Sequence, residues 1–246
     1  MAKYDYKEGK KRVNSILNDE NEIEEKDRVP SSNNFTYHNG YYSNVTAVFV
    51  DIKDSTTLFG ENKKKSTSKI IRAFSSEIIE ILKDDSNLRE IGIRGDCVYA
   101  IYSVSTKDDL EKILSDSILI NTFNKMFQKI LVNSNFVSFE IGIGLGLSEI
   151  LIVKTGQKFS GINDNVWIGE SVVDASKLSG QGNRDGFETI VMNELFFNNI
   201  KEFNANPEHN YSYYISCKYS YKSQSIVYQC DMINVDYNKW IDGGMK

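Results

Sequence analysis

The stretch VTAVFVDI, residues Val45–Ile52, decides the fold. It is rich in β-branched and aromatic residues and apolar at consecutive positions, which favours a central strand covered on both faces. A polar turn follows the strand, and apolar residues then recur at helical spacing up to Leu82, namely Ile70, Phe74, Ile78 and Ile81. We therefore expect a buried strand ending at Asp51 and, after the turn, a helix that faces the core.

The remaining sequence alternates between strand and helix patterns. REIGIRGDCVYAIYS (89–103) predicts a β-hairpin with Asp96 at its tip, and a helix is expected over 107–132. FVSFEIGIGLGLSEILIVKTG (136–156) predicts a second strand pair, in which glycines alternate along one face of the first strand and indicate close backbone approach: Gly142, Gly144 and Gly146. A helix from Gly169 to Leu178 and a strand pair within 211–235 complete the pattern. This order predicts an α+β fold, with a mainly antiparallel sheet and helices on one side.

The N-terminal region differs in composition from the rest. Residues 6–19 predict a short polar helix, and the Asn-, Glu-, Lys- and Ser-rich stretch that follows contains Pro30 and reads as an extension. We therefore expect an N-terminal helix and extended lead over residues 1–43, and one folded domain with C-terminal strands over 44–246.

Composition excludes several classes of protein. A chain of 246 residues with 40% hydrophobic content can bury one sizeable core, and a formal charge of −5 offers no basic field for nucleic acid. Three widely spaced cysteines, Cys97, Cys217 and Cys230, suggest neither zinc nor a disulfide framework and fit a reducing cytosol. No apolar run approaches the ~20 residues that a bilayer crossing needs. We expect a cytoplasmic protein with no nucleic-acid or membrane partner.

Two aspartates carry the chemistry. Asp51 and Asp96 each lie at the end of an apolar strand beside a turn, where paired carboxylates would hold two Mg²⁺ or Mn²⁺ ions for phosphoryl transfer. The following segment IKDSTT, with Ser55 and Thr56 and ending at Thr57, offers backbone N–H groups and hydroxyls to cradle a triphosphate. Taken singly, either aspartate also fits a helix cap or a turn residue.

Four segments resemble, in order, the blocks of the class III adenylate and guanylate cyclase family: VFVDIKDST, EIGIRGDCVYAIY, FEIGIGLGLSEI and VWIGESVVDASKLS. The resemblance spans 45–179 and implies a class III cyclase catalytic domain with a ferredoxin-like core. Such a domain turns a nucleoside triphosphate into a 3′,5′-cyclic monophosphate, in a homodimer with two composite sites. The lead, YDYKEGKKRVNSIL through NNFTYHNGYYSNVTAVFVDIKDST, further resembles the pyrimidine cyclases of the bacterial Pycsar anti-phage system.

The resemblance also implies roles for individual residues. Asp51 and Asp96 would bind the two metal ions, with the carbonyl of Ile52 as a further ligand. Lys177 stands where the family carries an arginine that stabilises the transition state, and it would supply positive charge without a bidentate fork. The usual ribose-orienting asparagine is replaced by Val173, so that either Asp174 substitutes for it or the contact is lost.

Departures from the family pattern point to the base. Gly92 and Val166 stand where adenylate cyclases carry their purine-reading side chains, and a pocket without those polar groups does not favour a purine. Phe49 and Arg94 would contact the base instead, although a core aromatic and a solvated charge are the plain alternatives. We expect conversion of UTP to cyclic UMP first and of CTP to cyclic CMP second. If the Pycsar resemblance holds, the product activates an effector during phage infection.

Two other functions remain open from the sequence. One is an adenylate cyclase with unusual base contacts. The other is a catalytically weak domain that binds nucleotide, suggested by Val173 and Lys177. Retention of both Asp51 and Asp96 argues against the second, because a pure binding module has little need for two metal carboxylates.

Overall fold

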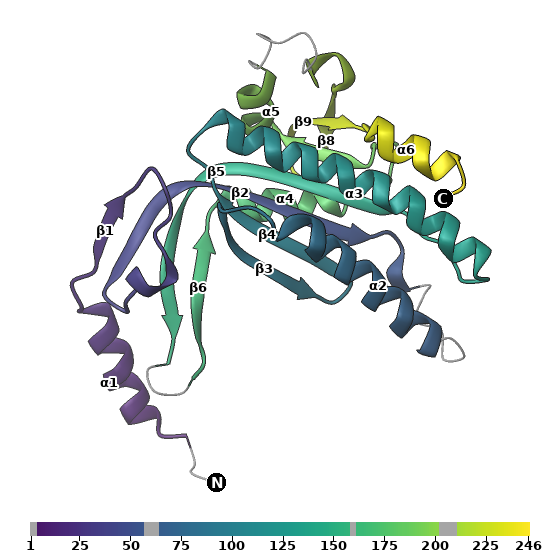
Figure 1. The fold of residues 1–246 in the computed structure, drawn as a ribbon. Helices are drawn as coiled ribbons and strands as arrows, with labels where there is room; N and C mark the ends of the chain where they lie inside the picture. The colour runs from purple at the N-terminus through teal and green to yellow at the C-terminus, as the bar shows by residue number, and fades with distance from the viewer. Residues whose placement is uncertain (1–3, 57–63, 158–160, 202–210) are drawn as a thin grey trace.

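A computed structural model describes residues 4–56, 64–157, 161–201 and 211–246 (Figure 1). The helices in this part of the chain are α1 (Tyr6–Leu17), α2 (Lys64–Leu82), α3 (Lys107–Asn133), α4 (Glu170–Ser179), α5 (Glu194–Ile200) and α6 (Val235–Asp242). The strands are β1 (Glu22–Glu25), β2 (Asn39–Ile52), β3 (Leu88–Arg94), β4 (Cys97–Ser103), β5 (Ile141–Gly156), β6 (Asn163–Ile168), β7 (Ile190–Asn193), β8 (Ser216–Ser220) and β9 (Ser225–Cys230).

All of these strands join one sheet. Its order is β3-β4-β2-β5-β7-β9-β8, with β1 added to β2 and β6 added to β5. Only the β1–β2 and β5–β7 pairs are parallel, and the other pairs are antiparallel. The predicted α+β fold with a mainly antiparallel sheet is confirmed.

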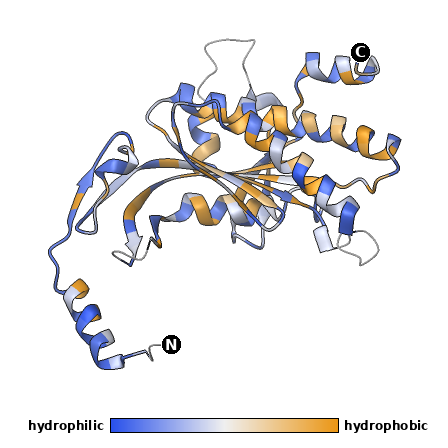
Figure 2. Cartoon of the chain, turned by 60° about the horizontal axis from the view of Figure 1, so that its bottom comes forward, coloured by the Kyte–Doolittle hydropathy of each residue, from blue (hydrophilic) through white to orange (hydrophobic). Residues whose placement is uncertain are grey.

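The central strands bury both of their faces, as the continuous apolar run in β2 predicts. Val48, Val50 and Ile52 point to one face, where they pack in the main core with Phe74 of α2 and Phe123 of α3. In Figure 1 both helices lie across this face, and Figure 2 shows hydrophobic residues concentrated in the strands and along α3. Residues that alternate with these in β2 point to the opposite face.

Helix α4 covers part of that opposite face, so the expectation of helices on one side is wrong. A Cβ atom added at Gly142, Gly144 or Gly146 of β5 would lie 2.0 to 2.1 Å from a backbone oxygen of α4 or its C-terminal end. Glycine therefore allows the helix to pack with its backbone against the sheet, as the alternating glycines predict. This close packing fixes the position of α4 and of the loop that follows it.

The expected strand pair within 136–156 is also wrong, because Ile141–Gly156 of this segment form the single long strand β5. Ser148 and Glu149, where a turn would fall, continue the ladder opposite Val45 and Asn44 of β2. The Ser148 hydroxyl accepts a hydrogen bond from the backbone N–H of Ser171 in α4 at 2.8 Å. These polar residues are thus satisfied by pairing and by α4 and need no turn.

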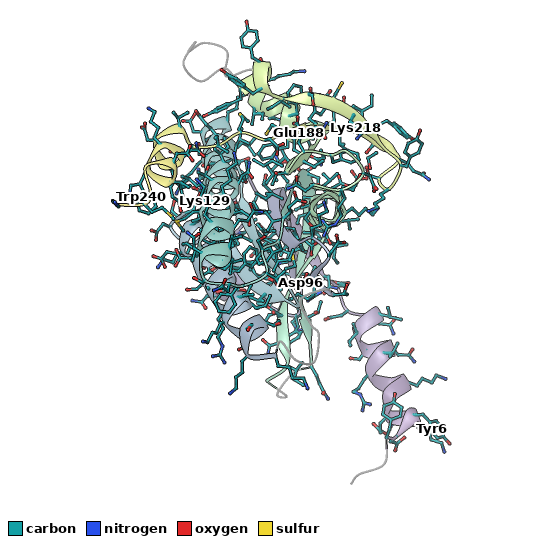
Figure 3. All side chains as sticks on the ribbon, turned by 90° about the vertical axis from the view of Figure 1, so that its right-hand side faces the viewer. Tyr6, Asp96, Lys129, Glu188, Lys218 and Trp240 are labelled. Atoms are coloured by element: carbon teal, nitrogen blue, oxygen red, sulfur yellow. The ribbon has the colours of Figure 1, made fainter. Side chains whose placement is uncertain are left out.

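Other elements lie outside the sequence prediction. Strands β1, β6 and β7 and helices α5 and α6 were not expected, and the boundary between 43 and 44 falls inside β2, which begins at Asn39. Helix α1 stands away from the body of the molecule, as the labelled Tyr6 shows in Figure 3. No helix in the described residues combines the length and the hydropathy needed to cross a membrane.

Candidate active site

The sheet face covered by α4 carries several of the predicted site residues. Phe49 and Asp51 alternate along β2, and their partners across the β2–β5 ladder are Gly144 and Gly142. On the other side of β2, Phe49 pairs with Tyr99 of β4. The strand period of two places all of these positions on one face.

The hairpin of β3 and β4 continues this face, and β3 carries two positions that were predicted to bind substrate. Gly92 pairs with Tyr99, and Arg94 pairs with Cys97. Asp96 lies in the turn that joins the two strands, on the body of the molecule as labelled in Figure 3.

Asp51 and Asp96 lie close enough to influence each other. The pKa of Asp51 is raised above its ordinary value, first by burial and then by the negative charge of Asp96, while Arg184 opposes the shift. The pKa of the neighbouring Cys97 is raised to about 12 by burial and by the charge of Asp51. Two carboxylates that repel each other in a half-buried place gain from a shared cation.

These oxygens fit a magnesium or manganese ion. Asp51, Asp96 and the carbonyl of Ile52 offer hard oxygen ligands, which these ions prefer. The described residues contain no cluster of three or more histidine, cysteine, aspartate or glutamate side chains that would enclose a metal. Such an incomplete donor set suits an ion whose other ligands are substrate phosphates and water.

The structure adds Arg184, which sequence reasoning missed. It lies in the loop between α4 and β7, and its Nη2 donates to Asp51 Oδ2 and to the Ile52 carbonyl, each at 3.1 Å. Its side chain is 19% exposed and that of Asp51 is 26% exposed. The one sequence feature that could have pointed to Arg184 is the segment GQGNRDG (180–186), a glycine-rich turn that contains this arginine.

A polar and aromatic cluster lies beside the two aspartates. The rings of Phe49 and Tyr99 stack with centroids 5.3 Å apart. A Cβ atom at Gly92 would lie 2.7 Å from the Tyr99 ring, so that glycine leaves room for this ring. Glu90 accepts hydrogen bonds from the Tyr99 hydroxyl at 2.7 Å and from the indole N–H of Trp167 at 2.6 Å. Burial and Glu90 raise the pKa of Tyr99 to about 12.

Two predicted base contacts lie at the margin of this cluster. Arg94 is exposed and close enough for its charge to oppose the rise in the pKa of Tyr99. Val166 of β6 is 39% exposed, and it precedes Trp167 in the strand, so the two side chains point to opposite faces. Trp167, which the sequence did not single out, is therefore the residue of β6 that reaches the cluster.

Helix α4 presents the two predicted catalytic residues. Asp174 is half-buried and accepts a hydrogen bond from the Asn193 side-chain amide at 3.0 Å, while Val173 beside it is 50% exposed. Lys177 is exposed in the last turn of the helix. Within one chain the structure thus brings together Asp51, the Ile52 carbonyl and Asp96, and it holds Asp174 through Asn193.

The expected triphosphate cradle is described only in part. Ser55 is half-buried and Thr56 is exposed in a short helical turn directly after β2. Thr57, the last residue of the cradle segment, lies outside the described residues. The turn places Ser55 and Thr56 a few residues beyond Asp51 in the chain.

Known proteins resemble this chain along most of its length. The sequence model of the family "Adenylate and Guanylate cyclase catalytic domain" matches residues 37–192. A uridylate cyclase of Treponema porcinum is 42% identical over 245 residues, covering 100% of this chain and 83% of that protein. A uridylate cyclase of Gulbenkiania mobilis is 31% identical over 220 residues, covering 85% of this chain and 84% of that protein.

A solved structure agrees in fold. The crystal structure of the adenylyl cyclase CyaB from P. aeruginosa superposes with a TM-score of 0.63 at 20% identity, covering 80% of this chain and 98% of that one. The family match spans more than half of the sequence, and it includes the strands and turns that hold Asp51 and Asp96. The chain therefore belongs to the class III adenylate and guanylate cyclase family, and it is a nucleotidyl cyclase.

Proposed function

We propose that this chain is a metal-dependent pyrimidine cyclase that converts UTP to 3′,5′-cyclic UMP and pyrophosphate. The observation that carries the choice of base is the cluster beside the two aspartates, where Tyr99 stacks on Phe49 and fills the space above Gly92. The similarity to two proteins named uridylate cyclase supports the same substrate.

The reaction needs charge and position more than covalent chemistry. Asp51, Asp96 and the Ile52 carbonyl would hold two divalent ions, Mn²⁺ or Mg²⁺. When bound, such ions activate the ribose 3′-oxygen and neutralise the departing pyrophosphate. The 3′-hydroxyl would lose its proton to solvent, and its oxygen would form a bond to the α-phosphorus as the bond to the leaving pyrophosphate breaks in line with it.

The chain's other residues orient the substrate. The turn with Ser55 and Thr56 would bind phosphate oxygens through backbone N–H groups and hydroxyls. Asp174, which accepts a hydrogen bond from Asn193, would accept another from a ribose hydroxyl. These contacts would fix the 3′-oxygen for attack.

Lys177 would act across a homodimer. Class III sites form between two cyclase domains, and this chain contains one, so two copies would build two sites. In each site the metals would come from one subunit and Lys177 from the other. The exposed ammonium of Lys177 would lie beside the charge that develops on the phosphate in the transition state.

Arg94 favours uracil over cytosine. A guanidinium only donates hydrogen bonds, and it therefore suits the carbonyl oxygens of uracil. Cytosine carries an amino group in place of one of these oxygens, and two donors facing each other cost affinity. Arg94 is exposed beside Tyr99, where it can meet the base.

Product analysis tests the proposal. Purified protein is incubated with Mn²⁺ and each of ATP, GTP, CTP and UTP, and cyclic products are identified by mass spectrometry. Cyclic UMP as the main product supports the proposal. Cyclic AMP would refute the choice of base while leaving the family intact, and no cyclic product from any of the four would favour a domain that only binds nucleotide.

Variants separate the roles of the residues. Asp96→Asn should abolish turnover while the protein remains folded by circular dichroism. Arg94→Ala should lower the preference for UTP over CTP by about tenfold, which corresponds to the ~1.4 kcal/mol that one hydrogen bond at an exposed site contributes. Arg72→Ala removes an exposed arginine from α2, and it should leave both activity and preference unchanged.

In the cell, the proposed role is signalling in anti-phage defence. Cyclic UMP made in the cytoplasm on infection would activate an effector that stops growth of the infected cell. Infection of cells carrying the wild-type gene should raise cyclic UMP, and the Asp96→Asn variant should not. If phage grow equally well on cells with the wild-type gene and on cells with the variant gene, this role is refuted.

A further inference from the structure

One cationic side chain already occupies the oxygens proposed for metal. Nη2 of Arg184 lies 3.1 Å from Asp51 Oδ2 and 3.1 Å from the carbonyl oxygen of Ile52. One nitrogen therefore donates hydrogen bonds to both proposed metal ligands, the carboxylate of Asp51 and the carbonyl of Ile52. The Arg184 side chain is only 19% exposed, so the guanidinium makes these contacts in a largely buried position.

The guanidinium is held from its other side as well. Nη1 of Arg184 donates to the carbonyl of Ser179 at 3.2 Å and to that of Gly182 at 3.3 Å. The backbone N–H of Arg184 donates to the carbonyl of Gln181 at 2.9 Å. The arginine therefore links the C-terminal end of α4 to the end of β2.

The loop that carries Arg184 is anchored by the β8–β9 hairpin. The Ser220 hydroxyl donates to the Gln181 side chain at 2.7 Å in a buried position. Lys218 Nζ donates to the Asp185 carbonyl at 2.9 Å, and Lys222 Nζ donates to the Gly180 carbonyl at 3.3 Å. Arg184 thus reaches Asp51 from a well-supported backbone.

We propose that Arg184 is an internal counter-cation that holds the metal ligands in the metal-free chain and that a divalent ion must displace from Asp51 and Ile52. Arg184 and Asp51 form a largely buried ion pair at 3.1 Å, with side chains 19% and 26% exposed, so the guanidinium neutralises the carboxylate where water screens it little. A dication bound to the same two oxygens repels the guanidinium at short range. Arginine and metal therefore compete, and the strength of the Arg184 contact sets how much metal the enzyme needs.

The inference rests on the proposed assignment of Asp51, Ile52 and Asp96 as metal ligands. It concerns a residue outside that ligand set, and it is tested by metal affinity measured without nucleotide. The free Mn²⁺ signal in electron paramagnetic resonance gives the dissociation constant for each variant directly. Turnover does not enter the measurement.

Four variants define the test. Arg184→Gln removes the competing charge and should bind Mn²⁺ about tenfold more tightly than the wild type, a change well above the precision of the titration. Arg184→Lys keeps a charge but has one donor group in place of the fork, and it should lie between the two. Lys222→Gln removes an exposed charge from the turn of the β8–β9 hairpin, which contacts the Arg184 loop but not Asp51, and its affinity should match the wild type. Asp96→Asn should bind more weakly.

The outcomes separate the two ideas. If Asp96→Asn weakens binding but Arg184→Gln binds no more tightly than the wild type, the metal assignment stands and competition by Arg184 is refuted. If Asp96→Asn has no effect, the metal assignment itself fails. Should Arg184→Gln not fold by circular dichroism, Arg184→Lys decides, since affinity equal to or below that of the wild type overturns the proposal and higher affinity supports it.

Discussion

Replacing Gly144 with alanine tests the close packing of α4 on the sheet. The added Cβ would lie 2.0 Å from the Ala175 carbonyl oxygen and 2.4 Å from the Ser179 backbone nitrogen. Ordinary contacts of a Cβ begin near 3.4 Å, so α4 would have to retreat by 1.4 Å, the difference between 3.4 and 2.0 Å. Both clashing atoms are backbone and have no rotamer to change. We expect a loss of about 3 kcal/mol in the free energy of unfolding, the upper part of the range for overpacked cores.

Urea unfolding followed by circular dichroism gives this free energy. Gly180→Ala is the matched control at the end of the same helix, because its Cβ would meet nothing closer than 3.5 Å and its φ is −70°. That variant should be unchanged or more stable by about 0.5 kcal/mol, since alanine restricts the unfolded chain. If Gly144→Ala unfolds within 0.5 kcal/mol of the wild type, roughly the scatter of neutral substitutions, the account of α4 packing is wrong.

Three further predictions follow from the contacts of single residues. Burial raises the pKa of Asp116 to about 6, so ionisation of this carboxyl destabilises the folded protein as the pH rises through that value. In urea unfolding, Asp116→Asn should therefore raise the free energy of unfolding by about 1 kcal/mol at pH 8, a value reduced for partial exposure of the side chain, and by less at pH 5. Asn193 caps α5 by accepting from the backbone N–H of Phe196, and its amide donates to Asp174, so Asn193→Ala should lower the free energy of unfolding by about 2 kcal/mol in the same assay. The variant should also have a lower kcat for UTP, and an unchanged kcat would show that Asp174 does not contact the ribose. Glu90→Gln leaves one oxygen for the two donors that now share the carboxylate, and we expect kcat/KM for UTP to fall by about tenfold, checked by steady-state kinetics.

Local pattern is enough to predict part of this architecture. The run VTAVFVDI becomes the buried part of β2, and the spacing of Ile70, Phe74 and Ile78 becomes the core face of α2, because periodicity records which side of an element is buried. The hairpin with Asp96 in its turn follows from two apolar runs around Gly95, whose φ of +66° suits glycine. The polar N-terminal helix is likewise confirmed, as α1.

Prediction from pattern fails where long-range pairing decides. Residues 141–156 form one strand because β2 and α4 satisfy Ser148 and Glu149, which the linear sequence presents as a turn. Strand β7 is a run of four residues, too short to carry a period, and it exists because β5 and β9 lie on both sides of it. Propensity yields to tertiary context in such segments.

For the candidate site, the sequence by itself, through its resemblance to the cyclase family, predicted Asp51, Ile52 and Asp96 as metal ligands and Lys177 on the later helix as a catalytic residue, and these roles stay predictions. Tertiary structure decided what surrounds them. Arg184 lies 133 residues from Asp51 in the chain and Trp167 lies 77 residues from Glu90, and no local pattern relates either pair. Only the packing of α4 against β5, and of β6 beside it, brings these charges and donors together, because a hydrogen bond depends on distance in space and not on separation along the chain.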